Sequence, residues 1–507
     1  ENFSDVKVWE ECMRPDARRV RILPMAEVHD VKLDKEGRPH KRKCRTRGKG
    51  FGQSKGIDHH DTHAPVIDPE IFRLCLVVAP ELDSSVEQFD FTAAFLTADS
   101  DAEMHAEMPP GCQPKMKGDV VLRLRKCICG MKQSAARFCK RVSKDLEQLG
   151  FRRSESSRCS LVKHHGSDVC LLTSHVDDGA HFARGRRVIQ KDLTLLRRKC
   201  RLESETLNWH IGLRISRTKD TISISCDSHI DACAKRFGVE GGAMVHTPIE
   251  KIPTKEAGTS SCTAECMELI GCLIHVSNAC RPDTSHAVGM LASCTINPGQ
   301  ESLPIGRRLL GCLFHSRERA LTFHRQGVKG GSDGDRIDNL LPEGFHDSDF
   351  AGGVDKRHSR SGCLIHFGSS LVWWTGELQS LIAQSVFEAE TIAANRCCKA
   401  LLFARKILFD ITGHPLRKDV PLHGDNEKSV ECAQPGNHGK RSKRFDVRLH
   451  HLHQGCNDGI ITTHHIKTDK NPADLLTGVV KKNIFLSLVD KLVSVSVSKV
   501  HSLFVHV

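Results

Sequence analysis

The pattern of apolar and polar positions predicts short strands alternating with amphipathic helices. Residues 169–182, VCLLTSHVDDGAHF, form an apolar run that leads to two adjacent carboxylates, Asp177 and Asp178. The Asp-Gly pair at 178–179 is a strong hairpin signal, so we expect the chain to turn there. Residues 220–226, DTISISC, alternate between apolar and polar and indicate another strand.

Several longer segments have a helical pattern. Residues 142–151, VSKDLEQLGF, predict a helix that stops at Gly150. The apolar segments 267–276 and 307–314 are typical of buried helices, and 385–413 predicts one long helix. We therefore expect an α/β (α+β) fold class.

Length and turn signals divide the chain. A chain of 507 residues is long enough for several domains. Thr247-Pro248 opens a looser segment, and the Gly-rich loop at 328–335 marks a second boundary. These signals predict units at 1–245, 246–340 and 341–485, followed by a tail at 486–507.

The paired carboxylates suggest metal chemistry. Negative charges held side by side at a hairpin tip are tolerated only if cations or water absorb their repulsion. Residues 85–96, SVEQFDFTAAFL, run an extended segment into a third acid, Asp90. Carboxylates from separate elements are what two-metal phosphoryl transfer requires. The alternative for the isolated pair is a solvated turn.

Charge and hydropathy indicate which kinds of partner the chain could bind. The formal net charge is +12, and basic residues cluster at 38–55. This suits a polyanion, although a solvated basic surface has the same composition. No apolar stretch of about 18 residues is present and the amino end is charged, so we expect no signal peptide or transmembrane segment.

Two residue types are used unusually. The 23 cysteines include no set with the spacing of a zinc quartet, which predicts free thiols in a reducing compartment. The chain contains no tyrosine, where roughly fifteen would be usual for this length. The bias indicates a directional mutational or editing process, or an old copy that has drifted.

A series of motifs resembles the reverse transcriptase of copia-type LTR retrotransposons. The series is QFDFTAAFL, EMHAEMPPGC, LRKCICGMKQSAARF and SHVDD, preceded by the basic segment that ends at Pro65. Residues 269–288, with Arg281-Pro282-Asp283, resemble the segment that follows the polymerase in these polyproteins. HDSDFAGG, SVFEAETIAA, HGDNEKSV and IKTDKNPADLLTG are similar, in order, to the family's ribonuclease H domain.

The resemblance implies an architecture and two sets of catalytic carboxylates. Residues 1–245 would form fingers and palm, 246–340 a helical thumb or connection region, and 341–485 a ribonuclease H-like domain. The catalytic and metal-binding residues would be Asp90, Asp177 and Asp178 in the polymerase and Asp347, Glu390, Asp425 and Asp474 in the nuclease. A register slip of two to Asp349 and Glu388 is the alternative for the nuclease set.

The resemblance also implies residues that contact nucleotide and nucleic acid. The nucleotide-binding residues would be Lys43, Arg45, Phe95, Gly130 and Gln133; the nucleic-acid-binding residues would be Lys49, His175, Arg441 and Lys443. Phe95 would act as a gate against a ribose 2′-hydroxyl, or else is a core residue. The basic residues would grip phosphates, or else form solvated turns. His175 stands where the family usually has tyrosine, which predicts an altered template-primer contact.

The implied function is RNA-directed DNA polymerase with ribonuclease H activity. Its cofactor would be Mg²⁺ (or Mn²⁺), two ions per active site, and its partners an RNA template, a DNA primer, an RNA-DNA hybrid, deoxynucleoside triphosphates and the rest of a retrotransposon polyprotein. The implied location is cytoplasmic, in virus-like particles, or nuclear. Arg158 and Phe350 depart from the family pattern, so the alternative is an inactive relic that at most binds nucleic acid.

Overall fold

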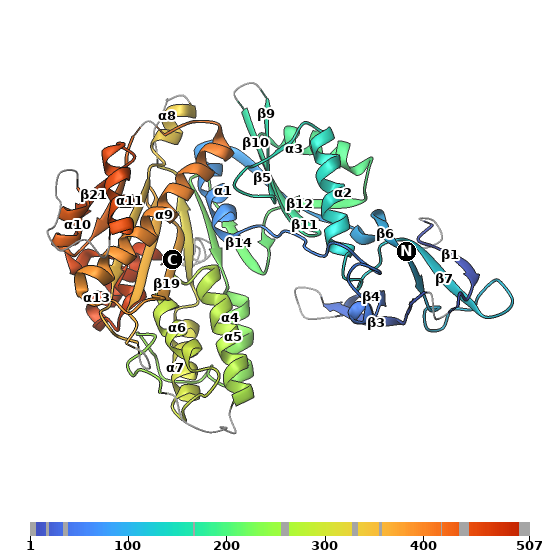
Figure 1. Cartoon of the computed structure of the whole chain (residues 1–507), viewed down its shortest axis with the longest axis horizontal. Coiled ribbons are helices and arrows are strands. Elements are labelled where there is room, and N and C mark those ends of the chain that lie inside the picture. The colour runs from blue at the N-terminus through green and yellow to red at the C-terminus, as the bar shows by residue number, and fades with distance from the viewer. Residues whose placement is uncertain are drawn as a thin grey trace, which may run out of the picture. The chain divides into compact units, whose positions relative to one another are not determined.

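The computed structural model describes residues 7–16, 20–33, 39–165, 168–254, 263–326, 333–353, 357–416, 418–434 and 446–495. The chain separates into two compact units. Unit 1 contains Glu1–Asp68 and Ser85–Thr206, and unit 2 contains Pro69–Ser84 and Leu207–Val507. Helices and strands are mixed in both units (Figure 1), which confirms the mixed α/β class.

Unit 1 has two sheets and a separate hairpin. The six-stranded sheet has the order β12-β5-β11-β10-β9-β8, and the four-stranded sheet has the order β1-β7-β6-β2. The strands of the first sheet are β5 (Ser84–Phe91), β8 (Arg152–Arg153), β9 (Ser160–His165), β10 (Asp168–His175), β11 (Asp178–Arg184) and β12 (Leu202–Thr206). The others are β1 (Trp9–Met13), β2 (Ile22–Leu23), β6 (Asp99–Ala106) and β7 (Val120–Lys126), with the hairpin β3 (Met25–Leu33) and β4 (Pro39–Gly48).

Two amphipathic helices pack on the six-stranded sheet. α2 (Ser134–Gln148) and α3 (Arg186–Arg197) bury residues one turn apart, such as Phe138 and Val142 or Ile189 and Leu193. These side chains join the strand residues in one hydrophobic core. α2 is followed by Gly150 at φ +89°, which confirms the predicted helix stop. The short 3₁₀ helices η1 (Gly50–Gly52) and η2 (Ala94–Thr97) complete unit 1.

Unit 2 begins with α1 (Pro69–Glu81) and contains two five-stranded sheets. The first has the order β13-β14-β15-β16-β22 and the second the order β19-β18-β17-β20-β21. The strands are β13 (Trp209–His210), β14 (Leu213–Arg217), β15 (Thr221–Ser225), β16 (Arg319–His324), β17 (Pro342–Ser348), β18 (Arg360–Phe367), β19 (Ser370–Leu378), β20 (Val420–Gly424), β21 (Ile461–His465) and β22 (Ser494–Val495). β15 confirms the strand predicted at 220–226.

The helices of unit 2 form two groups. The first is a bundle of α4 (Asp227–Phe237), α5 (Thr263–Ala279), α6 (Ser285–Ser293) and α7 (Ser302–His315), joined by η3 (Pro282–Thr284). The second surrounds the sheet β17–β21: α9 (Val386–Thr412), α10 (Glu427–Ala433), α11 (Asp446–Asn457), η5 (Thr468–Lys470), α12 (Asp474–Thr477) and α13 (Lys482–Leu492), while α8 (Asp333–Asp338) precedes it. None of the helices in the described part of the chain has both the length and the apolar character needed to cross a bilayer.

The Arg281-Pro282-Asp283 motif is a buried structural anchor. The Arg281 guanidinium donates to both carboxylate oxygens of Asp283 at 2.9 and 2.7 Å and also to the Ser316 carbonyl at 3.0 Å. Both charged side chains are almost fully buried. The motif therefore ties the end of α5 to the turn that follows α7.

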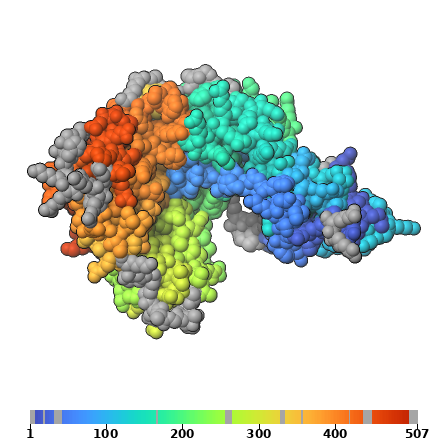
Figure 2. Space-filling view, in the orientation of Figure 1, coloured from blue at the N-terminus to red at the C-terminus, as the bar shows by residue number. Residues whose placement is uncertain are grey.

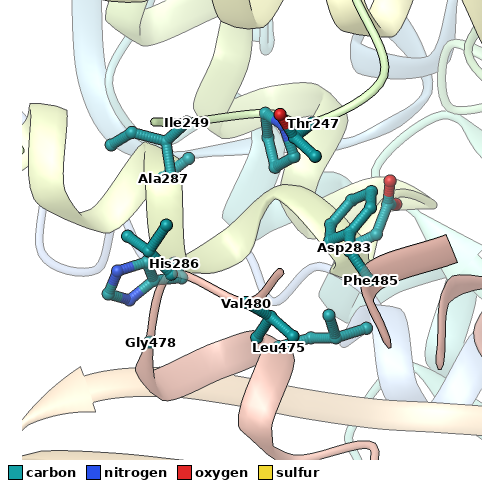
Figure 3. Close-up of a pocket in the computed structure, with 11 residues that line it drawn as sticks. Thr247, Ile249, Asp283, His286, Ala287, Leu475, Gly478, Val480 and Phe485 are labelled. Atoms are coloured by element: carbon teal, nitrogen blue, oxygen red, sulfur yellow. The ribbon is translucent and has the colours of Figure 1, made fainter. Parts of the chain in front are cut away.

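A small pocket lies beside this anchor. Figure 3 shows Asp283, His286 and Phe485 among its lining residues, with Thr247 on the facing segment. Burial and the nearby Arg360 guanidinium lower the pKa of His286 to about 4. The pocket contains none of the predicted catalytic carboxylates.

Candidate active sites

Asp177 and Asp178, two of the carboxylates predicted for the polymerase, lie at the end of the β10–β11 hairpin. His175 and Asp178 are paired across the hairpin, so the two-residue tip is Val176-Asp177. The expectation of a turn at Asp178-Gly179 was wrong by two residues. Gly179 instead permits close packing, because a Cβ atom there would lie 2.2 Å from the Phe89 ring.

The tip is strained and tied to the neighbouring strand. Val176 has φ +58°, a left-handed conformation that β-branched residues rarely adopt. The Asp177 carbonyl accepts a hydrogen bond of 2.9 Å from the Phe91 amide on β5. Asp90 precedes Phe91, is exposed and is paired with Glu203 on β12. Asp178 therefore begins β11, Asp177 lies in the tip next to it, and Asp90 lies on the neighbouring strand β5.

Burial and the neighbouring Asp177 charge shift the pKa values of the groups at this tip. Burial and the Asp177 charge raise the pKa of Asp178. Burial lowers the pKa of His175, against the opposing effect of Asp177. Asp90, Asp177 and Asp178 do not form a cluster of three ligand atoms within 4.8 Å in the part of the chain that is described. Two adjacent carboxylates and a third on the next strand are nevertheless a donor set that suits a hard divalent cation.

Phe95 lies in η2 and is half-buried. Its ring packs edge-on against Phe138, with centroids 6.2 Å apart, at the border of the hydrophobic core. The position is compatible with both sequence interpretations, since one part of the side chain is packed and another is accessible.

The predicted fingers residues lie on or just after β4. Lys43 is paired with Asp30 in the backbone register of β3 and β4. Arg45 donates to the Asp30 carboxylate at 2.6 Å, and Lys49 is exposed. Arg441 and Lys443 lie outside the described residues.

Gly130 and Gln133 lie just before α2, where the chain packs against the end of β4 and the loop that follows it. A Cβ atom at Gly130, which has φ +91°, would lie 2.2 Å from the Gly48 carbonyl. Gln133 is fully buried; it accepts from Gln53 at 2.9 Å and donates to the Asp58 carbonyl at 3.0 Å. Its amide is therefore used in packing the 53–58 loop, which the sequence analysis did not single out.

The carboxylates predicted for the nuclease converge at one end of the second sheet of unit 2. Asp347 is near the end of β17, Asp425 directly follows β20, and Asp474 begins α12. Oxygen atoms of these three residues lie within 4.8 Å of one another. Glu390 on α9 lies beside them, where it accepts from the Ser348 amide at 3.2 Å.

The convergence raises the affinity of these acids for protons. Burial and the Glu390 charge raise the pKa of Asp347 to about 7, and burial and the Asp347 charge raise the pKa of Asp474 to about 8. Asp474 Oδ1 and Glu390 Oε2 are buried without a hydrogen-bond partner among the described residues. Buried carboxylate oxygens with unused lone pairs fit a divalent cation such as Mg²⁺.

Neighbouring residues hold the nuclease carboxylates in place. The Thr477 hydroxyl donates to Asp347, and the Thr468 hydroxyl donates to Asp425 at 2.9 Å. Asn471 donates to the His346 carbonyl at 2.9 Å. Sequence analysis did not identify these residues, because a single Thr or Asn gives no signal without the fold.

The two acids of the alternative register have other contacts. Glu388 lies in the first turn of α9: its amide donates to the hydroxyl of the N-cap residue Ser385 at 3.2 Å, and its carboxylate accepts from the Gln384 amide at 2.5 Å. Asp349 accepts from the Arg360 amide. Neither belongs to the group of three oxygens that lie within 4.8 Å.

Comparison with known proteins defines the class. Residues 6–251 match the family model described as "Reverse transcriptase (RNA-dependent DNA polymerase)". A foamy viral protease-reverse transcriptase solved in complex with double-stranded DNA has a similar fold, with a TM-score of 0.50 and 12% identity over 92% of this chain and 68% of that one. Residues 6–251 are thus similar to the reverse transcriptase family, and the viral structure supports the same fold.

Relatives extend the match to most of the chain. It is 28% identical over 479 residues to the Retrovirus-related Pol polyprotein from transposon TNT 1-94 of Nicotiana tabacum, covering 92% of this chain and 35% of that protein. It is 24% identical to the corresponding protein from transposon RE1 of Arabidopsis thaliana, covering 95% of this chain and 32% of the relative. The chain is related to the Pol polyproteins of copia-type retrotransposons and spans about a third of the length of these relatives.

Proposed function

We propose that the chain is an RNA-directed DNA polymerase that also cleaves the RNA strand of RNA-DNA hybrids, and that both reactions use two metal ions. The observation that carries the nuclease part is the convergence of Asp347, Asp425 and Asp474 from separate elements. The observation that carries the polymerase part is the Val176-Asp177 tip, which is hydrogen-bonded to β5 beside Asp90, within the reverse transcriptase match.

In the polymerase, Asp90, Asp177 and Asp178 would hold the ions. Bound divalent cations supply Lewis-acid activation of the attacking hydroxyl and neutralise phosphate charge. The chain's own contribution is position: the hydrogen bond from Phe91 to Asp177 keeps the hairpin tip next to β5. The exposed Lys49 supplies positive charge for a nucleic-acid phosphate.

In the nuclease, Asp347, Glu390, Asp425 and Asp474 would hold the ions that activate the water nucleophile. Burial, together with repulsion between the carboxylates, raises the pKa of Asp347 and Asp474, so divalent cations compete with protons for these oxygens. Thr477 orients Asp347 by its hydroxyl, and Thr468 orients Asp425. The partners that follow are an RNA template, a DNA primer, an RNA-DNA hybrid and deoxynucleoside triphosphates.

The second candidate function is nucleic-acid binding by an inactive relic. It is favoured by Phe350, which is 47% exposed two residues after β17 and departs from the family residue at that position. It is also favoured by His175, whose ring carries a buried Nδ1 with no hydrogen-bond partner in the described residues.

The experiment uses the full chain and measures two reactions separately. Extension of a DNA primer on an RNA template with Mg²⁺ or Mn²⁺ tests the polymerase, and cleavage of a labelled RNA-DNA hybrid tests the nuclease. The double change Asp177→Asn, Asp178→Asn should abolish extension and leave cleavage unchanged. Asp347→Asn with Asp474→Asn should do the reverse.

Two exposed acids outside the sites serve as controls. Asp119→Asn alters an exposed ion pair with Arg14, and Asp458→Asn lies after α11, so neither should affect either reaction. A folded wild type that binds the hybrid but performs neither reaction would establish the relic. Activity that survives the carboxylate changes would show that it does not arise at these sites.

A further inference from the structure

Helices α4 and α5 face each other through three matched pairs of side chains. The rings of His229 and His275 are 4.8 Å apart, and at the far end of the contact Arg236 forms an ion pair with Glu268. Between them lie the thiols of Cys233 and Cys272, whose sulfur atoms are within 4.8 Å of each other. Residue numbers rise along α4 as they fall along α5, so the two helices are antiparallel across this contact.

The four central residues lie one helical turn apart on each helix. His229 and Cys233 are separated by four positions on α4, and Cys272 and His275 by three positions on α5. Residues at these spacings lie on the same helical face. The contact therefore presents two thiols and two imidazoles to one small volume.

The distances agree with a metal site. Ligand atoms of His229, Cys233 and Cys272 all lie within 4.8 Å of one another, and His229 Nε2 is 3.5 Å from Cys233 Sγ. A tetrahedral zinc ion with Zn–S of about 2.3 Å and Zn–N of about 2.0–2.1 Å requires an N···S separation of about 3.5 Å.

We propose that His229, Cys233 and Cys272 bind a zinc ion, with His275 as the fourth ligand. Two thiolates and two imidazoles select zinc over magnesium, because the latter prefers oxygen ligands. The ion would join α4 to α5, both in unit 2, and has no part in either phosphoryl-transfer reaction. In Figure 2 the bundle that contains these helices is the yellow-green region of the surface.

The surroundings of the ligands are consistent with this role. Cys233 is buried, Cys272 and His229 are half-buried, and His275 is exposed, so the site has one open side for entry of the ion. Burial and the Cys272 thiol raise the pKa of Cys233, so the ion has to displace thiol protons on binding.

The test is binding of Co²⁺ and Zn²⁺ to the full chain, purified without metal and kept reduced. Cobalt reports its ligands, since thiolate coordination gives charge-transfer bands and tetrahedral geometry gives intense d–d bands. Zinc affinity follows from competition with a chromophoric chelator. We expect one tetrahedral, thiolate-ligated cobalt per chain, displaced by one equivalent of zinc.

Variants locate the site. Cys272→Ser and His229→Gln should each weaken zinc binding by at least about tenfold, the scale seen even when only the partners of ligands are removed. Cys44→Ser is the matched control, because Cys44 belongs to the exposed group Glu27, His29 and Cys44, which offers a single thiol. This variant should keep the full cobalt spectrum.

Three results would overturn the proposal. The first is a folded, reduced wild type without thiolate-to-cobalt bands, and the second is binding that is lost in Cys44→Ser but retained in Cys272→Ser. The third is a stable Cys233–Cys272 disulfide that persists under reducing conditions, detected by mass. Because spectra are read on folded chains, a circular dichroism spectrum and an unfolding curve accompany each variant.

Discussion

The ring of Phe89 on β5 lies against the backbone of Gly179 on β11, so closely that a Cβ atom at Gly179 would be 2.2 Å from the ring. Gly179 follows Asp178, and Phe89 precedes Asp90. This contact thus helps to set the distance between the strands next to which the predicted polymerase carboxylates lie.

We predict that Gly179→Ala pushes the strands apart and reduces primer extension. A displacement of about 1 Å can lower an enzymatic rate by about a hundredfold, and overpacking costs about 1–3 kcal/mol of stability. Phe89→Leu should restore part of both losses in the double variant, measured as a double-mutant cycle. Gly271→Ala, where a Cβ atom meets nothing within 4 Å, is the control. Additive effects of Gly179→Ala and Phe89→Leu would contradict this account.

The carboxylates proposed for the nuclease should lower the free energy of unfolding when they are ionised. The folded-state pKa of Asp347, about 7, lies above its ordinary value of 3.8, so its ionisation destabilises the fold as pH rises from about 4 through 7. Asp347→Asn should therefore raise the free energy of unfolding at pH 8, without divalent cations, by a few kcal/mol. The gain should be smaller at pH 5, where the folded wild type is protonated.

Urea unfolding with a chelator at the two pH values checks this prediction. Mg²⁺ should then stabilise the wild type more than the Asn variant, because it binds the folded carboxylates. An Asn variant that is less stable than the wild type at pH 8 would mean that the carboxylate is stabilised by its surroundings.

Much of this arrangement could be predicted from sequence, but through two different kinds of signal. The β10–β11 hairpin and the stop after α2 follow from local pattern. The tip was placed two residues too late because Gly179 serves close packing against Phe89, a contact between distant segments. The convergence of the nuclease acids follows from family resemblance, since separate strands and helices carry them.

The proposed zinc-ligand set could not be recognised from the sequence, for a physical reason. Sequence analysis compared cysteine spacings within one segment, whereas Cys233 and Cys272 lie on two helices that meet only in the fold. Each helix contributes one Cys and one His, and neither pair alone is a zinc motif. In the same way, residues 69–84 and 207–245 join unit 2 through tertiary packing, without a local signal.

Buried histidines should make unit 2 sensitive to acid. Burial lowers the pKa of His366 to about 4, whereas an unfolded histidine titrates near 6.5. The unfolded state binds the proton first, so stability falls as pH decreases from about 6.5 to 4. At pH 5 the titration of His366 alone should lower the free energy of unfolding by about 2 kcal/mol.

The replacement His366→Phe removes the titration and preserves an aromatic ring beside Phe345, whose ring is 5.7 Å away. Its free energy of unfolding relative to wild type should improve by about 2 kcal/mol between pH 7 and pH 5. His246→Gln, at an exposed position, is the control. An identical pH profile for His366→Phe and wild type would show that His366 is not responsible.

The buried pair Arg281–Asp283 should be costly to break. Asp283→Ala leaves the Arg281 charge buried without its carboxylate, and such losses cost about 3–5 kcal/mol. Glu265→Ala, which breaks the exposed pair with Arg307, should cost less than about 1 kcal/mol. Chemical denaturation of the three proteins provides the comparison, and equal losses would refute a special role for burial.

A substitution at Phe95 distinguishes two roles for its ring, a gate against ribonucleotides and a core residue. If the ring excludes a ribose 2′-hydroxyl, Phe95→Val should increase incorporation of ribonucleotides relative to deoxynucleotides while stability changes little. If the ring serves mainly to pack against Phe138, the same change should destabilise unit 1 without altering this ratio, and truncation of a buried Phe to Ala costs about 3–5 kcal/mol. Phe138→Val, in the full core, is the matched variant. The half-buried position favours a gate whose base is packed, so we expect the nucleotide ratio to change in Phe95→Val and to stay constant in Phe138→Val.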